Sequence, residues 1–396
     1  MKLLVQLLII TTTTAANTPV VIIPGTAGNR LQGKLNKEAH SPHFYCEKTS
    51  DDWFDLWLSI TQLLPGAIDC WCENISLIYD EAADTLRNWP GVETRVPCFG
   101  DVCGIEYLDT DITVSDSAYF ADIIKAFEDS GYKRGVDLVS APYDWRFAAN
   151  SNNGNYINNT IALIEKMYSD NEDTPVMLLT HSMGGLWSAH ILRSEVDEEW
   201  KAKYLKSYVP IAPAFGGSVN EFKVFATGQA DDLPGISSST LRDEQRTYES
   251  NYWLLPNAEL WPEGEAVVTT AEGKTYNSHN LDQFFDDIGY GVGKKVTKRL
   301  EGIVSVEDVH MHDIHIFYGK DVDTDESYEY TKAGSWEEEG MKTKVGDGDG
   351  TVNIRSLEAG NGWGGVVEAV AMGGETHQGI LKNKVLIEKL LELAKT

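Results

Sequence analysis

A continuous apolar run leads directly into a helical pattern at residues 174–196. The run, TPVMLLT, is typical of a strand buried on both faces of a parallel sheet, because such strands meet packed side chains above and below. The next stretch, HSMGGLWSAHILRSEV, has the apolar spacing of a helix and begins without an intervening loop. A buried strand joined to a helix in this way is the repeating unit of α/β folds.

The same type of strand recurs along the chain, in PVVIIPG (19–25), YLKSYVPIAP (204–213) and IHIFYG (314–319). Helical patterns at 117–131 and 155–170 lie between these strands. Strands that alternate with helices predict a doubly wound α/β architecture. Since α/β folds often exceed the usual domain length, we expect residues 17–396 to form one domain.

The composition is that of a globular protein with a strong acidic excess. Hydrophobic residues make up 42% and charged residues 24%, which excludes a disordered chain or a disulfide-stapled miniprotein. Asp and Glu number 61 against 33 Lys and Arg, so the formal net charge is −28. This charge argues against a nucleic-acid partner, and it opposes contact with anionic membranes at neutral pH.

Residues 1–16 have the pattern of a cleaved secretory signal, with a basic Lys2, a short apolar run and small residues near Ala16. No other run reaches the roughly 18–20 apolar residues that span a bilayer. We therefore expect a soluble mature protein, residues 17–396, that is secreted or held in a lumen. The triplets N-I-S at Asn74 and N-N-T at Asn158 are predicted glycosylation sites.

Five cysteines lie in the first third of the chain, and in an oxidising compartment an even subset of them is expected to pair. Their spacing alone leaves the pairing open. The positions are 46, 70, 72, 98 and 103.

Ser182 lies in T-H-S-M-G, between the buried strand and the helix that follows it. Acyl-transfer hydrolases place a nucleophilic serine on such a turn, which requires small residues two positions before and after it. Gly184 meets this requirement, whereas Thr180 is larger than the usual glycine. The alternative is a serine that caps the helix. An oxyanion needs two backbone N–H donors, which we assign to Met183 and to Thr26 in the loop after the first strand.

A serine hydroxyl becomes a nucleophile when a histidine accepts its proton and a carboxylate orients that histidine. In α/β hydrolases these residues follow in the order Ser, Asp, His. Downstream of Ser182, KVGDGDGTVN contains Asp347 and Asp349, and GGETHQG contains His377. The alternative for GDGDG, a calcium loop, lacks the closing glutamate that such loops require.

His310, His312 and His315 invite interpretation as a metal site. Along a strand, alternation would put His315 on the opposite face from His310 and His312. We therefore predict structural histidines, no metal site and no cofactor.

Two segments depart from the strand–helix alternation. Residues 226–250 are polar, glycine-bearing and long for a connection, which is typical of a lid. Residues 46–72 gather large apolar side chains that mark either a contact surface or part of the core: Trp53, Phe54, Leu56, Trp57, Leu58, Leu63, Leu64 and Ile68. We expect the acidic stretch 321–340 to be a solvated surface insertion.

From Val20 to the C-terminus the chain resembles the lecithin:cholesterol acyltransferase and lysosomal phospholipase A family. The motifs that carry the resemblance are VIIPGTAGNRLQGKL, CEKTSDDWFDLWL, LLPGAIDCW, APYDWR, THSMGG, APAFGG, DEQR, WLLP, FFDDIG and GDGDGTVN. It implies an α/β-hydrolase fold with a membrane-binding loop at about 46–72 and a lid at about 226–250. It also implies a site composed of Ser182 as nucleophile, Asp349 and His377 as triad partners, and Thr26 and Met183 as oxyanion donors.

The resemblance further implies a disulfide between Cys46 and Cys70 that closes the membrane-binding loop. Cys98 and Cys103 are the second pair we predict, which leaves Cys72 free. The resemblance assigns lipid contact to Trp57, and we extend this role to its neighbours Trp53, Phe54 and Leu58. It also makes Asp144 and Arg146 structural partners beneath the site. Thr26 replaces an acidic residue of the lysosomal branch.

The expected function is that of a serine phospholipase A and transacylase, which forms an acyl-enzyme and passes the acyl group to water or a lipid alcohol. The alternatives are a sterol O-acyltransferase of the same family and a catalytically inactive lipid-binding protein. The expected partners are a phospholipid membrane or lipoprotein surface and a lipid alcohol acceptor. We expect a monomer of the secretory pathway, either secreted or in the lysosomal lumen.

Overall fold

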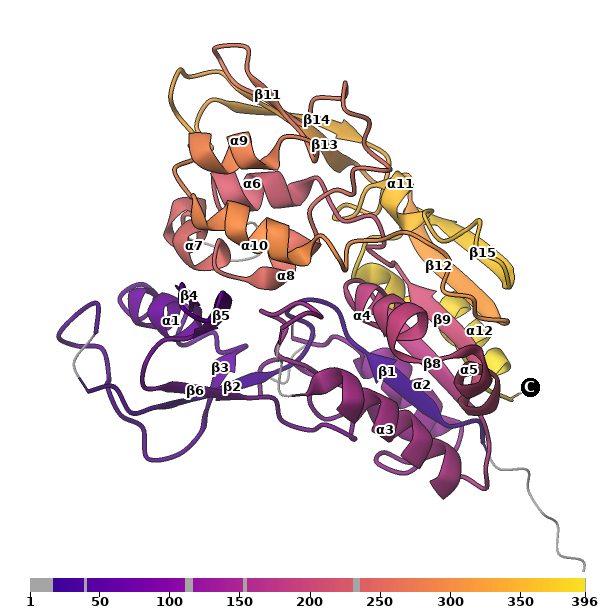
Figure 1. Ribbon diagram of the computed structural model, residues 1–396. Coiled ribbons are helices and arrows are strands. Elements are labelled where there is room, and N and C mark those ends of the chain that lie inside the picture. Colours follow the sequence, from indigo (N-terminus) through magenta and orange to yellow (C-terminus); the bar gives the residue numbers. More distant parts are fainter. Residues whose placement is uncertain (1–16, 39–40, 111–116, 152–154, 231–235, 396) are drawn as a thin grey trace, which may run out of the picture.

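The central element of the fold is a parallel six-stranded sheet (Figure 1). This computed structural model describes residues 17–38, 41–110, 117–151, 155–230 and 236–395. The expected signal at 1–16 lies outside the described residues. In spatial order the strands are β15 (Val366–Gly373), β12 (Ile314–Lys320), β9 (Leu205–Ile211), β8 (Val176–His181), β1 (Val20–Ile23) and β7 (Leu138–Ser140).

The four predicted strands all lie in this sheet as β1, β8, β9 and β12. Every residue of β1 and β8 is buried, in agreement with their continuous apolar sequences. Helices cover the sheet on both faces, with α3 and α5 in front and α12 behind in Figure 1. These and their neighbours are α2 (Ala121–Asp129), α3 (Tyr156–Asp170), α4 (Gly184–His190), continued by a π-helical turn at Ile191–Glu195, α5 (Glu198–Tyr204) and α12 (Lys384–Lys395). The predicted α/β class is confirmed.

A second layer lies at one end of the central sheet, in the rose and orange part of Figure 1, and is called the cap here. Its sheet has the order β11-β10-β13-β14, with β11 (Thr275–Tyr276), β10 (Val268–Thr269), β13 (Thr324–Tyr330) and β14 (Met341–Gly346). Its helices are α6 (Asn220–Ala226), α7 (Ser238–Gln245), α8 (Glu249–Trp253), α9 (Leu281–Asp287) and α10 (Val292–Leu300). The short helix α11 (Ile354–Leu357) precedes the last strand of the central sheet, β15, and a 3-10 turn at Gly379–Lys382 follows that strand and precedes α12.

The prediction that 321–340 is a solvated insertion is wrong for its first half. Strand β13 buries Thr324, Tyr328 and Tyr330, while the acidic residues between them are partly buried (Asp325 and Glu326) or exposed (Glu329). Because alternate residues of a strand point to opposite faces, a sequence rich in acids still places three side chains inside.

The N-terminal part forms a small layer beside the cap (Figure 1). It contains an antiparallel sheet of order β3-β2-β6, with β3 (Phe54–Trp57), β2 (Leu31–Leu35) and β6 (Val92–Arg95). A hairpin, β4 (Leu77–Asp80) with β5 (Thr85–Asn88), and helix α1 (Ile68–Ile75) complete it. The N-terminal layer, the cap and the central sheet all contribute to one hydrophobic cluster. Within the described residues, no helix combines the length and apolar character needed to cross a membrane.

Candidate active site

Ser182 occupies the sharp turn between β8 and α4. Its φ of 55° lies in the left-handed region, which side chains other than glycine rarely adopt. A Cβ at Gly184 would lie 2.4 Å from the Ile23 carbonyl oxygen, so this position requires glycine. The buried Thr180 fits in the place of the usual glycine. The capping alternative is wrong, because Met183 occupies the N-cap position and no side chain caps the helix.

His377 joins Ser182 to a buried carboxylate. Its Nε2 lies 2.9 Å from Ser182 Oγ, and its Nδ1 lies 2.7 Å from Asp349 Oδ2. The two partners come from separate loops, Asp349 between β14 and α11 and His377 after β15. With Nδ1–H donating to Asp349, Nε2 is free to accept the Ser182 proton. The arrangement can therefore generate an alkoxide-like nucleophile.

Asp349 is held by its own turn. Its Oδ1 accepts the backbone N–H groups of Thr351 and Val352 at 3.1 and 2.8 Å, which leaves Oδ2 for His377. Asp347 is exposed and accepts the backbone N–H of Asp321 at 2.7 Å. Both carboxylates of GDGDG are thus engaged by the protein, and only Asp349 is paired with His377 among the described residues.

The two predicted oxyanion donors come from the two segments next to Ser182 Oγ, its own turn and the turn after β1. Met183 is buried at the start of α4, and Thr26 is exposed in the turn after β1. The Thr26 turn approaches the nucleophile closely, since a Cβ at Gly25 would lie 2.7 Å from Ser182 Cβ. Their backbone N–H groups are the candidates for binding an oxyanion.

Two residues that the sequence reasoning did not assign lie directly behind the triad. Tyr119 Oη lies 2.6 Å from His181 Nδ1, and His181 Nε2 lies 2.9 Å from the His377 carbonyl oxygen. Burial lowers the pKa of His181 well below its ordinary value, so its imidazole is neutral. His181 had a signal, its place directly before Ser182, whereas Tyr119 is remote in sequence.

The expected lipid-contacting side chains Trp53, Phe54, Trp57 and Leu58 are half-buried and form no open patch. Trp57 donates its indole N–H to the Ala27 carbonyl at 2.8 Å, and its ring packs edge-on against the Trp145 ring. Trp53 packs beneath the Arg95 guanidinium. Part of each of these side chains therefore packs against the protein itself, and their contact with lipid stays a prediction.

The exposed apolar side chains of this region lie in two neighbouring stretches of the chain. They are Phe44 (99% exposed), Tyr45 (48%), Ile60 (39%) and Leu64 (53%). Cys46, which follows Tyr45, forms a disulfide with Cys70 in α1, which begins soon after Leu64, as the resemblance implied. We call these four side chains the apolar rim.

The remaining cysteines also follow the expected pattern. Cys98 and Cys103 form a disulfide, and Cys72 forms none. Burial raises the pKa of the Cys72 thiol, so it stays protonated and is a poor nucleophile.

The two sequons differ in accessibility. Asn158 is exposed on α3. Asn74 is 7% exposed within α1, so the expectation of a glycan at Asn74 does not fit the folded chain. Glycosylation at Asn158 remains a prediction.

The three clustered histidines do not converge. His312 is exposed and His310 lies 3.9 Å from Asp308. His315 is held between Glu368 and Asp313, at 2.7 and 3.0 Å. Among the described residues, no group of three or more potential ligands could hold a metal ion.

The segment expected to be a lid, 226–250, is largely helical where it is described, and 231–235 lie outside the described residues. Helix α7 buries Leu241, and Arg246 donates to the Phe225 carbonyl at 2.6 Å. The polar sequence therefore forms a packed helix, which buries Leu241 together with the polar residues Ser238 and Glu244. Its role as a lid stays a prediction.

Asp144 and Arg146 form a buried pair, in agreement with the structural role implied for them. The Arg146 guanidinium contacts both Asp144 oxygens, at 2.8 and 2.6 Å. It also donates to the Ile75 carbonyl at 2.8 Å, which fixes the end of α1 to the core.

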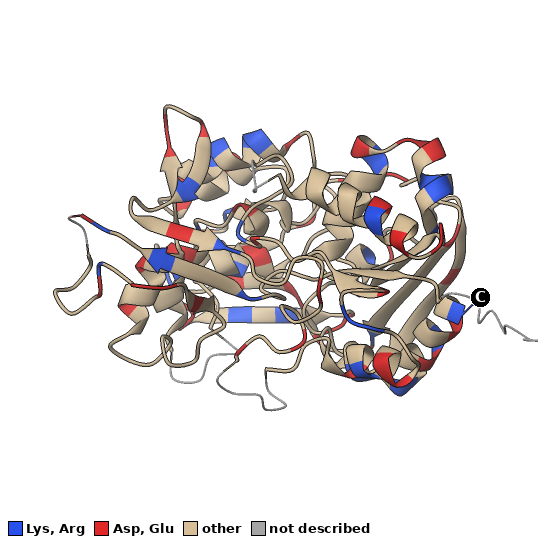
Figure 2. Cartoon of the chain, turned by 90° about the horizontal axis from the view of Figure 1, so that it is seen from below, with Lys and Arg blue, Asp and Glu red and all other residues tan. Residues whose placement is uncertain are grey.

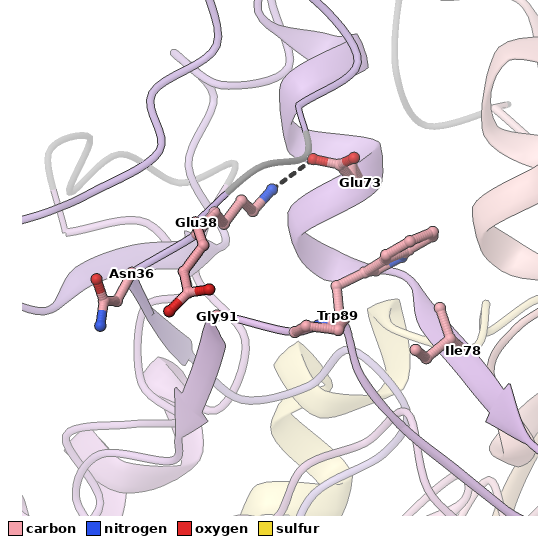
Figure 3. Close-up of a pocket in the computed structure, with 8 residues that line it drawn as sticks. Asn36, Glu38, Glu73, Ile78, Trp89 and Gly91 are labelled. Carbon is pink, nitrogen blue, oxygen red and sulfur yellow. Dashed lines mark hydrogen bonds and ion pairs between the residues drawn. The ribbon is translucent and has the colours of Figure 1, made fainter.

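A cavity of about 470 Å³ lies in the N-terminal layer, away from the triad (Figure 3). Its walls include Trp89, Ile78 and an ion pair between Lys37 and Glu73. None of the triad residues lines it.

Comparisons relate this chain to known proteins. Residues 53–307 match the sequence model of the family described as lecithin:cholesterol acyltransferase. The bovine (Bos taurus) lysosomal phospholipase A and acyltransferase is 36% identical over 376 residues, which cover 94% of this chain and 90% of that protein. The rat (Rattus norvegicus) phosphatidylcholine-sterol acyltransferase is 29% identical over 373 residues, which cover 93% and 83%. A solved structure, the Tle4–Tli4 complex, aligns with a TM-score of 0.52 at 14% identity over 95% of this chain and 98% of that one, a likeness of fold alone.

Proposed function

Because the chain belongs to the lecithin:cholesterol acyltransferase family, it is an acyl-transferring lipid enzyme, and we propose that it is a phospholipase A and transacylase with Ser182 as nucleophile. The observation that carries this proposal is the line of contacts from Ser182 Oγ through His377 to Asp349, at 2.9 and 2.7 Å. The phospholipase is favoured over the sterol enzyme because the bovine phospholipase is 36% identical and the rat sterol acyltransferase 29%.

In the proposed first half-reaction, Ser182 Oγ attacks the carbonyl carbon of a phospholipid acyl ester while His377 Nε2 takes its proton. Asp349 stabilises the imidazolium that forms. The backbone N–H groups of Thr26 and Met183 bind the developing oxyanion. His377 then protonates the departing lysophospholipid oxygen, which leaves the acyl group esterified to Ser182.

In the second half-reaction, water or the hydroxyl of a lipid alcohol attacks the acyl-enzyme. His377 accepts the proton of the attacking group and returns it to Ser182 Oγ as the ester breaks. Water gives a free fatty acid, whereas a lipid alcohol gives a new ester. Both reactions use the same catalytic groups. The ratio of free fatty acid to new ester therefore depends on how much lipid alcohol reaches the site.

We propose that the apolar rim brings the enzyme to a phospholipid membrane or lipoprotein surface. Phe44, Tyr45, Ile60 and Leu64 offer exposed apolar surface on one cross-linked pair of segments. The protein is of the secretory pathway, secreted or in the lysosomal lumen, in keeping with its two disulfides and the lysosomal name of its bovine relative. A monomer is sufficient for the chemistry, since one chain supplies all three triad residues.

The test is a product analysis on three kinds of phosphatidylcholine vesicle. One contains no acceptor, one contains ceramide and one contains a sterol. We expect fatty acid without acceptor and an additional acyl-ceramide with ceramide. Sterol ester as the main product would favour the sterol acyltransferase instead. The Ser182→Ala variant serves as the blank, and fatty acid release undiminished in that blank would contradict the proposal.

A further inference from the structure

A line of hydrogen bonds runs behind the triad through two buried side chains. The Gly25 backbone N–H donates to Tyr119 Oη at 3.0 Å, and Tyr119 Oη lies 2.6 Å from His181 Nδ1. His181 Nε2 lies 2.9 Å from the His377 carbonyl oxygen. Both side chains are buried, so these contacts are shielded from water.

Which atom donates in each hydrogen bond follows from the His377 carbonyl oxygen at the end of the line. A carbonyl oxygen accepts only, so His181 Nε2 must carry the proton that it donates to His377. Neutral His181 then presents a bare Nδ1, which accepts the Tyr119 hydroxyl proton. Tyr119 Oη in turn accepts the Gly25 N–H with a lone pair. Every donor and acceptor in the line is used, and His181 has one tautomer.

The line connects three of the four segments that form the site, all but the Asp349 loop. Gly25 precedes Thr26 in the turn after β1, His181 precedes Ser182, and the carbonyl at the far end belongs to His377 itself. The Tyr119 ring also defines the path of the first segment, because a Cβ at Gly28 would lie 2.7 Å from it.

We propose that Tyr119 and His181 are positioning residues, which hold the Thr26 turn and the His377 loop in fixed positions relative to Ser182. The inference rests on the proposed function, because it assigns Thr26 to the oxyanion and His377 to proton transfer. Loss of one of these hydrogen bonds leaves the surface that binds the substrate intact. It moves the Thr26 N–H and the His377 imidazole relative to the reacting carbonyl. The effect is therefore expected in kcat rather than KM.

Tyr119→Phe is the sharpest variant, because it removes one hydroxyl and keeps the ring. We expect kcat on a soluble p-nitrophenyl ester to fall by about 10- to 100-fold, with KM changed by less than about twofold. Tyr132→Phe is the matched control. Tyr132 is equally buried, and its hydroxyl donates to the Thr18 carbonyl at 3.0 Å, far from the triad.

Tyr132→Phe is expected to melt at a temperature similar to that of Tyr119→Phe and to keep the parent's kcat. A parental kcat in Tyr119→Phe would overturn the proposal. An equal fall of kcat in both variants would also overturn it, since the loss would then follow general destabilisation. Ser182→Ala separates the two claims: if it abolishes turnover while Tyr119→Phe does not reduce it, only the positioning role fails.

A second pair of variants tests His181. His181→Gln still offers one amide acceptor and one amide donor, whereas His181→Leu offers neither. We expect the Gln variant to retain at least tenfold more kcat than the Leu variant at equal folded fraction by near-UV circular dichroism. Equal kcat in the two folded variants would overturn the proposal. If either variant fails to fold, the Tyr119→Phe result decides.

Discussion

At the scale of single residues, the two carboxylates of GDGDG have separate tasks. Asp349 divides its oxygens between its own turn and His377, while exposed Asp347 holds the backbone N–H of Asp321. A carboxylate that receives two backbone N–H groups is held in place, which is what an orienting group requires.

Asp349→Asn is therefore expected to lower kcat by about 10⁴-fold, because the amide favours the wrong His377 tautomer. Asp347→Asn should change kcat by less than about threefold. Steady-state kinetics on a soluble ester compare the two directly. Equal losses would leave the assignment unsupported, and a loss in Asp347→Asn alone would reverse it.

The sequence was sufficient to predict Ser182, Asp349 and His377 as candidates, because each lies in a short motif at a chain position that the fold makes meaningful. Tyr119 was out of reach. Its partner His181 lies 62 residues away in the sequence, and no local sequence pattern predicts a hydrogen bond between two such distant residues. The partial burial of Trp57 could not be predicted for a similar reason, since its partners Ala27 and Trp145 come from other segments.

At the scale of elements, the N-terminal layer divides apolar side chains between its interior and the apolar rim. Half-buried Trp57 belongs to the interior, and Phe44 belongs to the rim. Strands such as β1 and β8 were predicted from sequence because burial on both faces favours an apolar residue at nearly every position. Strand β13 was missed because its three buried residues stand among acidic ones.

Phe44→Ser is expected to weaken binding to phosphatidylcholine vesicles by about tenfold or more, because a large side chain buried in acyl chains contributes roughly 1.5–3 kcal/mol. Turnover of a soluble ester should stay at the parent's level. Val385→Ser, which removes an exposed apolar side chain from α12, is the control and should bind as the parent does. Flotation measures all three. Binding by Phe44→Ser at parental strength would exclude Phe44 from the contact surface.

The Asp144–Arg146 pair fixes one end of this layer, through the Ile75 carbonyl. Arg146→Met should lower the free energy of unfolding by about 3–5 kcal/mol, because it removes the cation that is paired with the buried Asp144 carboxylate. Arg87→Met removes an exposed arginine paired with Asp80 and should have a much smaller effect. Denaturant titration of the two variants makes the comparison. Equal decreases in the free energy of unfolding would contradict the prediction that the buried pair contributes more to stability than the exposed one.

At the scale of the whole molecule, acidity is distributed rather than local. In Figure 2, Asp and Glu lie on elements across the molecule, interspersed with Lys and Arg. With a net charge of −28, binding to anionic vesicles is expected to strengthen as the pH falls toward 5, because carboxylates take up protons. Flotation with anionic vesicles at pH 7.5 and 5 tests this, and stronger binding at pH 7.5 would contradict it.

Two buried carboxyls in the cap add a pH dependence of stability. Burial raises the pKa of Glu221 and of Glu244 to about 8. Between their ordinary pKa near 4.5 and about 8, the unfolded chain releases these protons while the folded chain keeps them. The free energy of unfolding should therefore fall as pH rises through this window, by about 1 kcal/mol per pH unit for each group.

The parent should thus melt at a higher temperature at pH 5 than at pH 7.5. Glu221→Gln and Glu244→Gln should each reduce this difference, since an amide does not titrate. Glu199→Gln, at an exposed position, should leave it unchanged. Thermal melts at the two pH values provide the test, and an unaltered difference in both cap variants would contradict the assignment.

The central claim, that Ser182 carries the acyl group, is tested most directly by labelling the full chain with a fluorophosphonate probe and mapping the modified peptide by mass spectrometry. Activation by His377 at 2.9 Å makes Ser182 the most reactive hydroxyl that the structure describes. The predicted result is a single adduct on Ser182 in the parent and none in the Ser182→Ala variant. An adduct at another residue with Ser182 unmodified, or equal labelling of the Ser182→Ala variant, would contradict it.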